Sequence, residues 1–215
     1  MKTFRRLGTL TAGLFIGLGL GLPALAAPVQ DGADVADVDA VVATVEAKRA
    51  GDARRVGMPD DLYAGEELVT GKGARLHATL TDGGKLMLGE EAVVALDRFL
   101  LEADEPAGAV RVTKGAFRMI SGSINKGLGG TLTLRTPVAT IGVRGTDFWG
   151  LQTEDSLLMA LLDDGELSIT FPTGTVVLSE PMTLVRYQRG QERPVMDVLT
   201  PEALSEAAAT VTLPQ

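Results

Sequence analysis

The chain has 215 residues, a formal net charge of −8, no cysteine and one histidine. An acidic chain of this kind is a poor partner for nucleic acid, anionic membrane surfaces and polyanionic substrates. The lack of cysteine excludes disulfide bonds, thiol catalysis and a cysteine-linked lipid anchor, and one histidine cannot build a histidine-based zinc site.

Residues 1–26 have the pattern of a secretory signal peptide. A basic start precedes an uncharged apolar run at 7–22, and a small-x-small cleavage motif follows at 24–26. The apolar run is shorter than the ~20 residues that a membrane-spanning helix needs. We therefore expect export, cleavage near Ala26 and a bacterial periplasmic location, with an uncleaved N-terminal anchor as the alternative. No later apolar run has spanning length, so we expect no membrane span after cleavage.

The next segment, residues 27–39, is small, acidic and without hydrophobic periodicity. Its aspartates, at positions 31, 34, 37 and 39, do not follow the spacing, central glycine and closing glutamate of an EF-hand calcium loop. The segment is therefore predicted to be a flexible, solvated acidic lead-in and not a calcium site.

Residues 40–190 carry around a dozen short apolar or alternating runs separated by turn residues. Hairpin signals stand at 81–84 and 163–165, and the runs lie at 41–46, 62–70, 74–80, 86–88, 93–101, 110–112, 116–120, 131–135, 157–162, 167–171, 176–178 and 183–187. This pattern predicts an all-β domain with a sandwich or jelly-roll arrangement, and a β-helical winding stays open.

The remaining residues, 191–215, are predicted to form a C-terminal extension with one short helix. Thr200 can cap it and Pro201 suits the first helical position.

The stretch 131–150 predicts a strand followed by a rigid corner. Leu132 and Leu134 alternate with polar residues, Pro137 breaks the ladder, and Gly142 and Gly145 flank a turn. The two glycines superficially resemble a phosphate-binding loop, but the required lysine and following helix are missing. We therefore expect the glycines to provide positive φ angles, in which case valine at either position should destabilise the chain by more than about 1 kcal/mol.

No constellation of residues predicts catalysis. His77 falls on the polar side of an alternating strand and is expected to be a surface residue. The paired carboxylates at 66–67, 90–91 and 163–164 are adjacent in strands, so they point to opposite faces. We predict a chain that is not an enzyme, with no catalytic residue, no cofactor and no metal site.

Residues 136–148, with the sequence TPVATIGVRGTDF, resemble the signature of the FecR domain, a family named after the periplasmic regulator of ferric-citrate uptake. Pieces at 71–76, 80–89, 114–118 and 164–167 fit the family in order, so the resemblance covers roughly residues 67–184. The motif residues, for which we expect a mainly structural role, are Thr136, Pro137, Ala139, Ile141, Gly142, Val143, Arg144, Gly145, Thr146 and Phe148.

Within this stretch, Arg144 and Trp149 are the candidates for contact with a partner. Arg144 is also expected to pair locally with Asp147 or with the carbonyls of a neighbouring strand. Trp149 is the only tryptophan in the chain, and a small-ligand pocket beside it is a weaker alternative.

The resemblance implies an all-β periplasmic domain that senses or relays a signal, with an envelope or inner-membrane protein as partner. In the best-known members, a cytoplasmic segment that controls a sigma factor precedes a membrane helix, and a C-terminal domain receives the signal. We expect none of these three parts in this chain, which places direct sigma-factor control in doubt. The expectation is a stand-alone, non-catalytic sensory or protein-interaction module, and the rival is a structural component of the envelope or matrix.

Overall fold

The computed structural model describes residues 32–100, 107–124 and 130–214. The predicted signal peptide and residues 27–31 of the predicted lead-in lie outside these ranges. In the described ranges, no helix has the length and apolar character that crossing a membrane requires.

The described residues form 17 strands in two sheets, which are joined through one long strand, β9 (Ala107–Ile120). Sheet A consists, in spatial order, of β4 (Asp61–Tyr63), β1 (Asp34–Val42), β6 (Arg75–Leu80), β7 (Lys85–Leu88), the second half of β9, β12 (Asp147–Gln152), β13 (Ser156–Leu161), β16 (Thr183–Gln188) and β17 (Val195–Val198). Sheet B consists of β3 (Asp52–Arg55), β2 (Val45–Arg49), β5 (Glu67–Thr70), β8 (Val93–Leu100), the first half of β9, β10 (Thr131–Arg135), β11 (Thr140–Arg144), β14 (Glu166–Phe171) and β15 (Gly174–Leu178).

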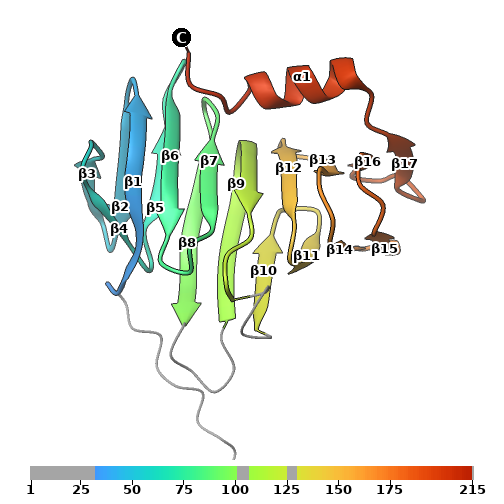
Figure 1. The fold of residues 1–215 in the computed structure, drawn as a ribbon, viewed down its shortest axis with the longest axis horizontal. Coiled ribbons are helices and arrows are strands. Elements are labelled where there is room, and N and C mark those ends of the chain that lie inside the picture. The colour runs from blue at the N-terminus through green and yellow to red at the C-terminus, as the bar shows by residue number, and fades with distance from the viewer. Residues whose placement is uncertain (1–31, 101–106, 125–129, 215) are drawn as a thin grey trace, which may run out of the picture.

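After β9, the chain advances as hairpins that alternate between the sheets. The hairpins β10–β11 and β14–β15 lie in sheet B, whereas β12–β13 and β16–β17 lie in sheet A. Successive hairpins of one sheet then pair through β11–β14 and β13–β16. Each passage between hairpins is therefore a corner at which the chain changes sheet (Figure 1).

The two sheets pack face to face, and the apolar side of each strand fills the space between them. Phe171 of sheet B lies with its ring 4.6 Å from that of Tyr187 of sheet A, centroid to centroid. Phe117 and Phe148, neighbours within sheet A, are fully buried and meet edge to face at 6.5 Å. The alternation of buried and exposed residues along the strands thus gives one continuous core.

One helix, α1 (Pro201–Ala209), covers part of the outer face of sheet A. Figure 1 shows it running across one end of the strand array, with the C-terminus close to β6. Thr200 caps the helix by accepting a hydrogen bond from the Ala203 backbone N–H, and Pro201 occupies its first turn. The predicted all-β fold with a short C-terminal helix is confirmed, including the residues that start the helix.

Three details differ from the sequence predictions. Strand β1 begins at Asp34, so the second part of the predicted lead-in is a strand; the domain boundaries themselves stay a prediction. The predicted strand at 41–46 is interrupted at Ala43, whose φ of 58° turns the chain from sheet A to sheet B. The hairpin predicted at 163–165 is wrong, because β13 and β14 belong to different sheets and do not pair.

Candidate functional site

The family-like motif builds a packed set of turns, here called the corner cluster: Asp82, Ser121, Gly145, Thr146, Asp163 and Gly165. Gly145 and Thr146 carry the chain from β11 to β12, and Asp163 and Gly165 carry it from β13 to β14. The buried Thr146 donates its hydroxyl hydrogen to the carbonyl of Asp163 at 2.9 Å. The Gly145 φ of 51° and the Gly165 φ of 137° allow the two turns to pack directly on each other.

The turn after β9 joins the same cluster. The Ser121 N–H donates to the Thr146 carbonyl at 2.9 Å, and the Thr146 N–H donates to the Ser121 hydroxyl at 3.1 Å. Asp82, in the β6–β7 turn, accepts from the backbone N–H of Ser123 through its carbonyl, at 2.8 Å. The corner cluster therefore links four turns of the chain through hydrogen bonds between their backbone and side-chain groups.

The other motif residues have structural positions as well. Thr136 accepts the backbone N–H of Ala139 at 3.0 Å and thereby fixes the turn that contains Pro137. Inward-facing members of the motif, all buried, are Ile141, Val143 and Phe148. Gly142 lies in the extended backbone of β11 without a positive φ, so the expectation is met at Gly145 and wrong at Gly142.

The local ion pair expected between Arg144 and Asp147 does not form. Arg144 lies 3.4 Å from Glu166 on the outer face of sheet B, with most of its side chain exposed. Asp147 begins β12 in sheet A, where Arg118 donates to its two carboxylate oxygens at 2.9 and 2.6 Å. This hydrogen-bonded pair raises the pKa of Arg118. The corner at Gly145 separates the two partners, since it moves the chain to the other sheet.

Trp149 points away from the core, onto the outer face of sheet A, and is covered by the C-terminal segment. Its side chain is only 4% exposed, and its indole N–H donates to the Thr210 hydroxyl at 3.0 Å. A small apolar cavity of about 240 Å³ lies between Trp149, Leu184 and Ala207 of α1. A partner can reach Trp149 only if α1 moves, whereas Arg144 is directly accessible.

A larger cavity of about 1010 Å³ adjoins this covered face, and we call it the rim cavity. It is open to solvent and is lined by residues of the middle of β9, the end of β12, the Pro137 turn and the last turn of α1. Leu151, Glu206 and Thr210 line both cavities, so the rim cavity and the Trp149 environment are continuous.

Gln152, at the wall of the rim cavity, is a buried polar residue that the sequence predictions do not single out. Gln152 is 1% exposed, and its Oε1 has no hydrogen-bond partner among the described residues. Its Nε2 donates to the carbonyl of Thr153. Sequence could have given a signal, because Phe148, Gly150 and Gln152 share the inward face of one strand and a polar residue is unexpected there.

The remaining candidate groups have structural partners. His77 lies in β6 with its Nε2 2.7 Å from the carbonyl oxygen of Val211, a contact that ties down the chain after α1. Glu66, 4% exposed, is held by two hydrogen bonds from Arg54 at 3.0 and 3.1 Å, and this pairing raises the pKa of Arg54. Its neighbour Glu67 points to the other side of β5, so these carboxylates do not converge.

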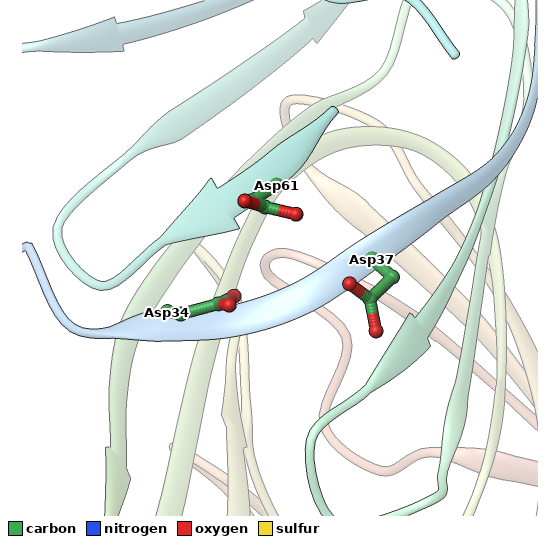
Figure 2. Close-up of side chains that lie close together, drawn as sticks. All are labelled: Asp34, Asp37 and Asp61. Carbon is green, nitrogen blue, oxygen red and sulfur yellow. The ribbon is translucent and has the colours of Figure 1, made fainter. Parts of the chain in front are cut away.

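Three exposed aspartates gather where β1 and β4 pair (Figure 2). Carboxylate oxygens of Asp34, Asp37 and Asp61 lie within 4.8 Å of one another. Partial burial, together with the repulsion from Asp61 and Asp37, raises the pKa of Asp34. Exposed acidic groups often lie this close together without an ion, and we do not assign a metal to them.

Comparison with known proteins agrees with this architecture. The family model described as "FecR protein" matches residues 66–168, which include the whole corner cluster. Among proteins with curated descriptions, none matches the chain significantly. Two crystal structures of a "putative anti-sigma factor" from Parabacteroides distasonis ATCC 8503, at 1.65 and 2.50 Å resolution, each match with a TM-score of 0.54 and 16% identity, covering 65% of this chain and 62% of that chain.

The chain thus spans 62% of the length of these solved structures, and the likeness to them shows a shared fold. The motif at 136–148 lies within the residues that the family model matches. The resemblance to the FecR family that the sequence predicts is therefore confirmed over residues 66–168.

Proposed function

We propose that this protein is a periplasmic, non-catalytic module that senses or relays a signal in the cell envelope through contact with another protein. The observation that carries the proposal is the FecR match over residues 66–168. The shared fold with a structure described as an anti-sigma factor supports a regulatory role. The leader pattern at 1–26 supports the periplasmic location.

The chemistry of the described residues supports a non-catalytic role. In the corner cluster the signature residue Thr146 bonds to Asp163 and Ser121, and His77 is engaged with the C-terminal chain. A general base requires a nucleophile and an orienting partner within reach. The motif residues stabilise the fold, and we expect partner contacts on the surface of the domain.

The edge strand β17 is the surface that best suits a protein partner. It pairs with β16 on one side, and all four of its residues are exposed. Val195, Met196 and Val198 are 48, 50 and 66% exposed, which is unusual for large apolar side chains on a strand. An apolar edge strand offers backbone hydrogen bonds and side-chain contacts to an added strand.

Site-specific photo-crosslinking in intact cells tests the proposal. A photoreactive residue at position 198 should capture one discrete envelope protein, because this side chain is the most exposed apolar group of the edge. The same residue at position 144 tests the accessible Arg144, and position 72, an exposed turn residue, is the control.

Adducts confined to copies of the protein itself, or no adduct from either test position, would contradict a relay through a partner. Recovery only with wall or matrix material would instead favour a structural component of the envelope.

A further inference from the structure

We infer that the partner adds an extended strand to β17, with apolar side chains beside Met196 and Val198 and a basic side chain beside Asp197. The same aspartate keeps two copies of this chain from pairing with each other at that edge. The inference rests on the proposed function, because it names the kind of segment through which the partner binds. It depends on the contrast between the sheet edges, on the direction of the backbone groups of β17 and on the charge of Asp197.

The two ends of the double sheet differ in how their edge strands are protected. At one end, β3 and β4 are four and three residues long, and three of the four residues of β3 are charged. Short, charged strands are a common protection of a sheet edge. At the other end (Figure 1), β15 and β17 carry four of the five exposed large apolar side chains of the described residues: Val177, Val195, Met196 and Val198. The apolar edges therefore lie together at one end of the molecule.

The backbone of β17 presents Met196 to the open side of sheet A. The N–H of Leu199 donates to the carbonyl of Met182 at 2.7 Å, a bond that continues the register of β16 with β17. Bonded and non-bonded pairs alternate in an antiparallel ladder, so Asp197 bonds to β16, whereas the N–H groups of Met196 and Val198 point away from it. The Asp197 carboxylate accepts the Val198 N–H at 2.9 Å. The N–H of Met196 is therefore the group that is open to an added strand.

The side chains of β17 give an added strand two different sides. Met196 lies opposite the core residue Val185 of β16, so Met196 and Val198 face the space between the sheets. Both are half exposed or more, although they lie on the core side. Asp197 lies on the outer face, where Arg186 donates to it at 3.1 Å. An added strand with apolar residues on its inward side would extend the core over Met196 and Val198.

The charge of Asp197 limits which strand can be added. If a second copy supplied its own β17 in antiparallel orientation, the register that uses both outward-pointing residues would pair Met196 of each copy with Val198 of the other. That register places the two Asp197 side chains directly opposite each other in a non-bonded pair, where side chains are closest and like charges are destabilising. A basic residue of a partner strand at this place would be attracted to Asp197 instead. The edge thus favours an apolar–basic–apolar segment over a second copy.

Titration with two synthetic peptides tests the added strand. The probes are acetyl-TVKVT-amide and acetyl-TVEVT-amide, which differ only in the charge that would lie beside Asp197. In NMR of the purified protein, the lysine peptide should slow the hydrogen exchange of the Met196 amide, which faces the open edge, and should leave that of the Asp197 amide unchanged. The glutamate peptide should bind at least about threefold more weakly, because its carboxylate is repelled.

Two substitutions of Met196 separate strand pairing from side-chain contact. Met196→Ala keeps the N–H and shortens the apolar side chain. Met196→Pro also removes the N–H, but no bond to β16 is lost, so the fold should persist, as far-UV circular dichroism checks. Met196→Pro should weaken binding of the lysine peptide at least about threefold more than Met196→Ala does. Equal weakening in two folded variants, or an unprotected Met196 amide in the wild-type complex, would overturn the added strand.

Removal of the charge tests the role of Asp197 in self-pairing. Asp197→Asn keeps an acceptor for the Val198 N–H and removes the repulsion, so this variant should dimerise in sedimentation experiments at concentrations where the wild type is monomeric. Asp155→Asn is the control, because Asp155 is also exposed and paired with an arginine, at 3.0 Å, but precedes β13, which is not an edge strand. A monomeric Asp197→Asn, or equal dimerisation of the wild type, would show that the charge does not prevent self-pairing.

These tests fail separately from the proposed function. Capture of an envelope protein at position 198 needs only that a partner lies near β17, whereas protection of the Met196 amide needs a paired strand. Capture in cells combined with failed peptide tests would therefore overturn the added strand and leave the relay through a partner in place.

Discussion

At the scale of single residues, Gly165 is the position where the corner cluster leaves the least room. Its φ of 137° is disfavoured for other residues, and an added Cβ would lie 2.4 Å from the carbonyl oxygen of Gly145. That oxygen belongs to the backbone of a neighbouring turn and cannot move without opening the cluster. We expect Gly165→Ala to lower the free energy of unfolding by about 2–4 kcal/mol, measured by urea denaturation.

Gly174 is a matched control for this prediction. It has nearly the same φ, 138°, and an added Cβ would meet no atom within 4 Å. Gly174→Ala should therefore show the backbone strain alone, about 1 kcal/mol. If both variants lose the same stability, the two turns do not pack on each other as tightly as this structure has them.

The same residues show what a sequence can predict at this scale. The positive φ of Gly145 follows from glycine in a turn motif, which is local information. The contact between Gly165 and Gly145 is not local, because it depends on two corners meeting after an intervening hairpin. The predicted ion pair between Arg144 and Asp147 is wrong for the same reason. The two residues are close in sequence, but the corner between them places each beside a different strand.

At the scale of elements, the sequence predicts that α1 forms but does not predict where it packs. Thr200 and Pro201 identify its start from sequence, since a cap and a first-turn proline act locally. Its docking face is mostly alanine, with Ala207 buried and Leu204 partly buried, and so has no amphipathic pattern strong enough to locate it. The covering of Trp149 by this helix became visible only in the structure.

The docking of α1 gives a prediction of its own. Ala207 is 6% exposed and faces Trp149 and Leu184 across the small apolar cavity, so an arginine there would place a charge in apolar surroundings, which costs free energy. Ala207→Arg should lift the helix and shift the emission of Trp149 to longer wavelength, while the far-UV circular dichroism of the sheets stays close to wild type. Stability should fall by about 1–3 kcal/mol, as for other disrupted apolar contacts.

Ser205→Arg is the control for that variant, because Ser205 is exposed on the same helix. It should leave the emission of Trp149 unchanged. Unaltered emission in Ala207→Arg as well would mean that α1 does not cover Trp149 in solution.

At the scale of the whole molecule, the sequence predicts the class of fold and leaves its assembly open. Alternating runs and turn residues indicate an all-β chain because they report which side of each strand is buried. They do not show which strands pair. The pairings β1–β6, β11–β14 and β13–β16 all join strands that are separated by other strands in the chain. The Asp-Gly turn at 81–84 makes a true hairpin, whereas the similar turn at 163–165 changes sheet. Similar Asp-Gly turns thus have two topological roles.

The strand that holds the molecule together is β9, which is why its central glycine affects both sheets. Gly115 has a φ of 98° at the point where β9 leaves sheet B for sheet A, and an added Cβ would lie 2.4 Å from Cα of Ala92. Gly115→Ala therefore opposes the passage of the strand between the sheets. We expect it to lower the free energy of unfolding by about 3 kcal/mol or more.

The loss should appear in both sheets together. Trp149 emission reports on sheet A and far-UV circular dichroism on all strands, and in a cooperative domain the two unfolding curves coincide. Gly115→Ala should move both midpoints to lower urea by the same amount. Gly73→Ala, at a turn glycine with a φ of 67° and no atom within 4 Å of an added Cβ, should shift them less. If the dichroism midpoint stays in place while that of Trp149 moves, the sheets unfold independently, and β9 does not couple them.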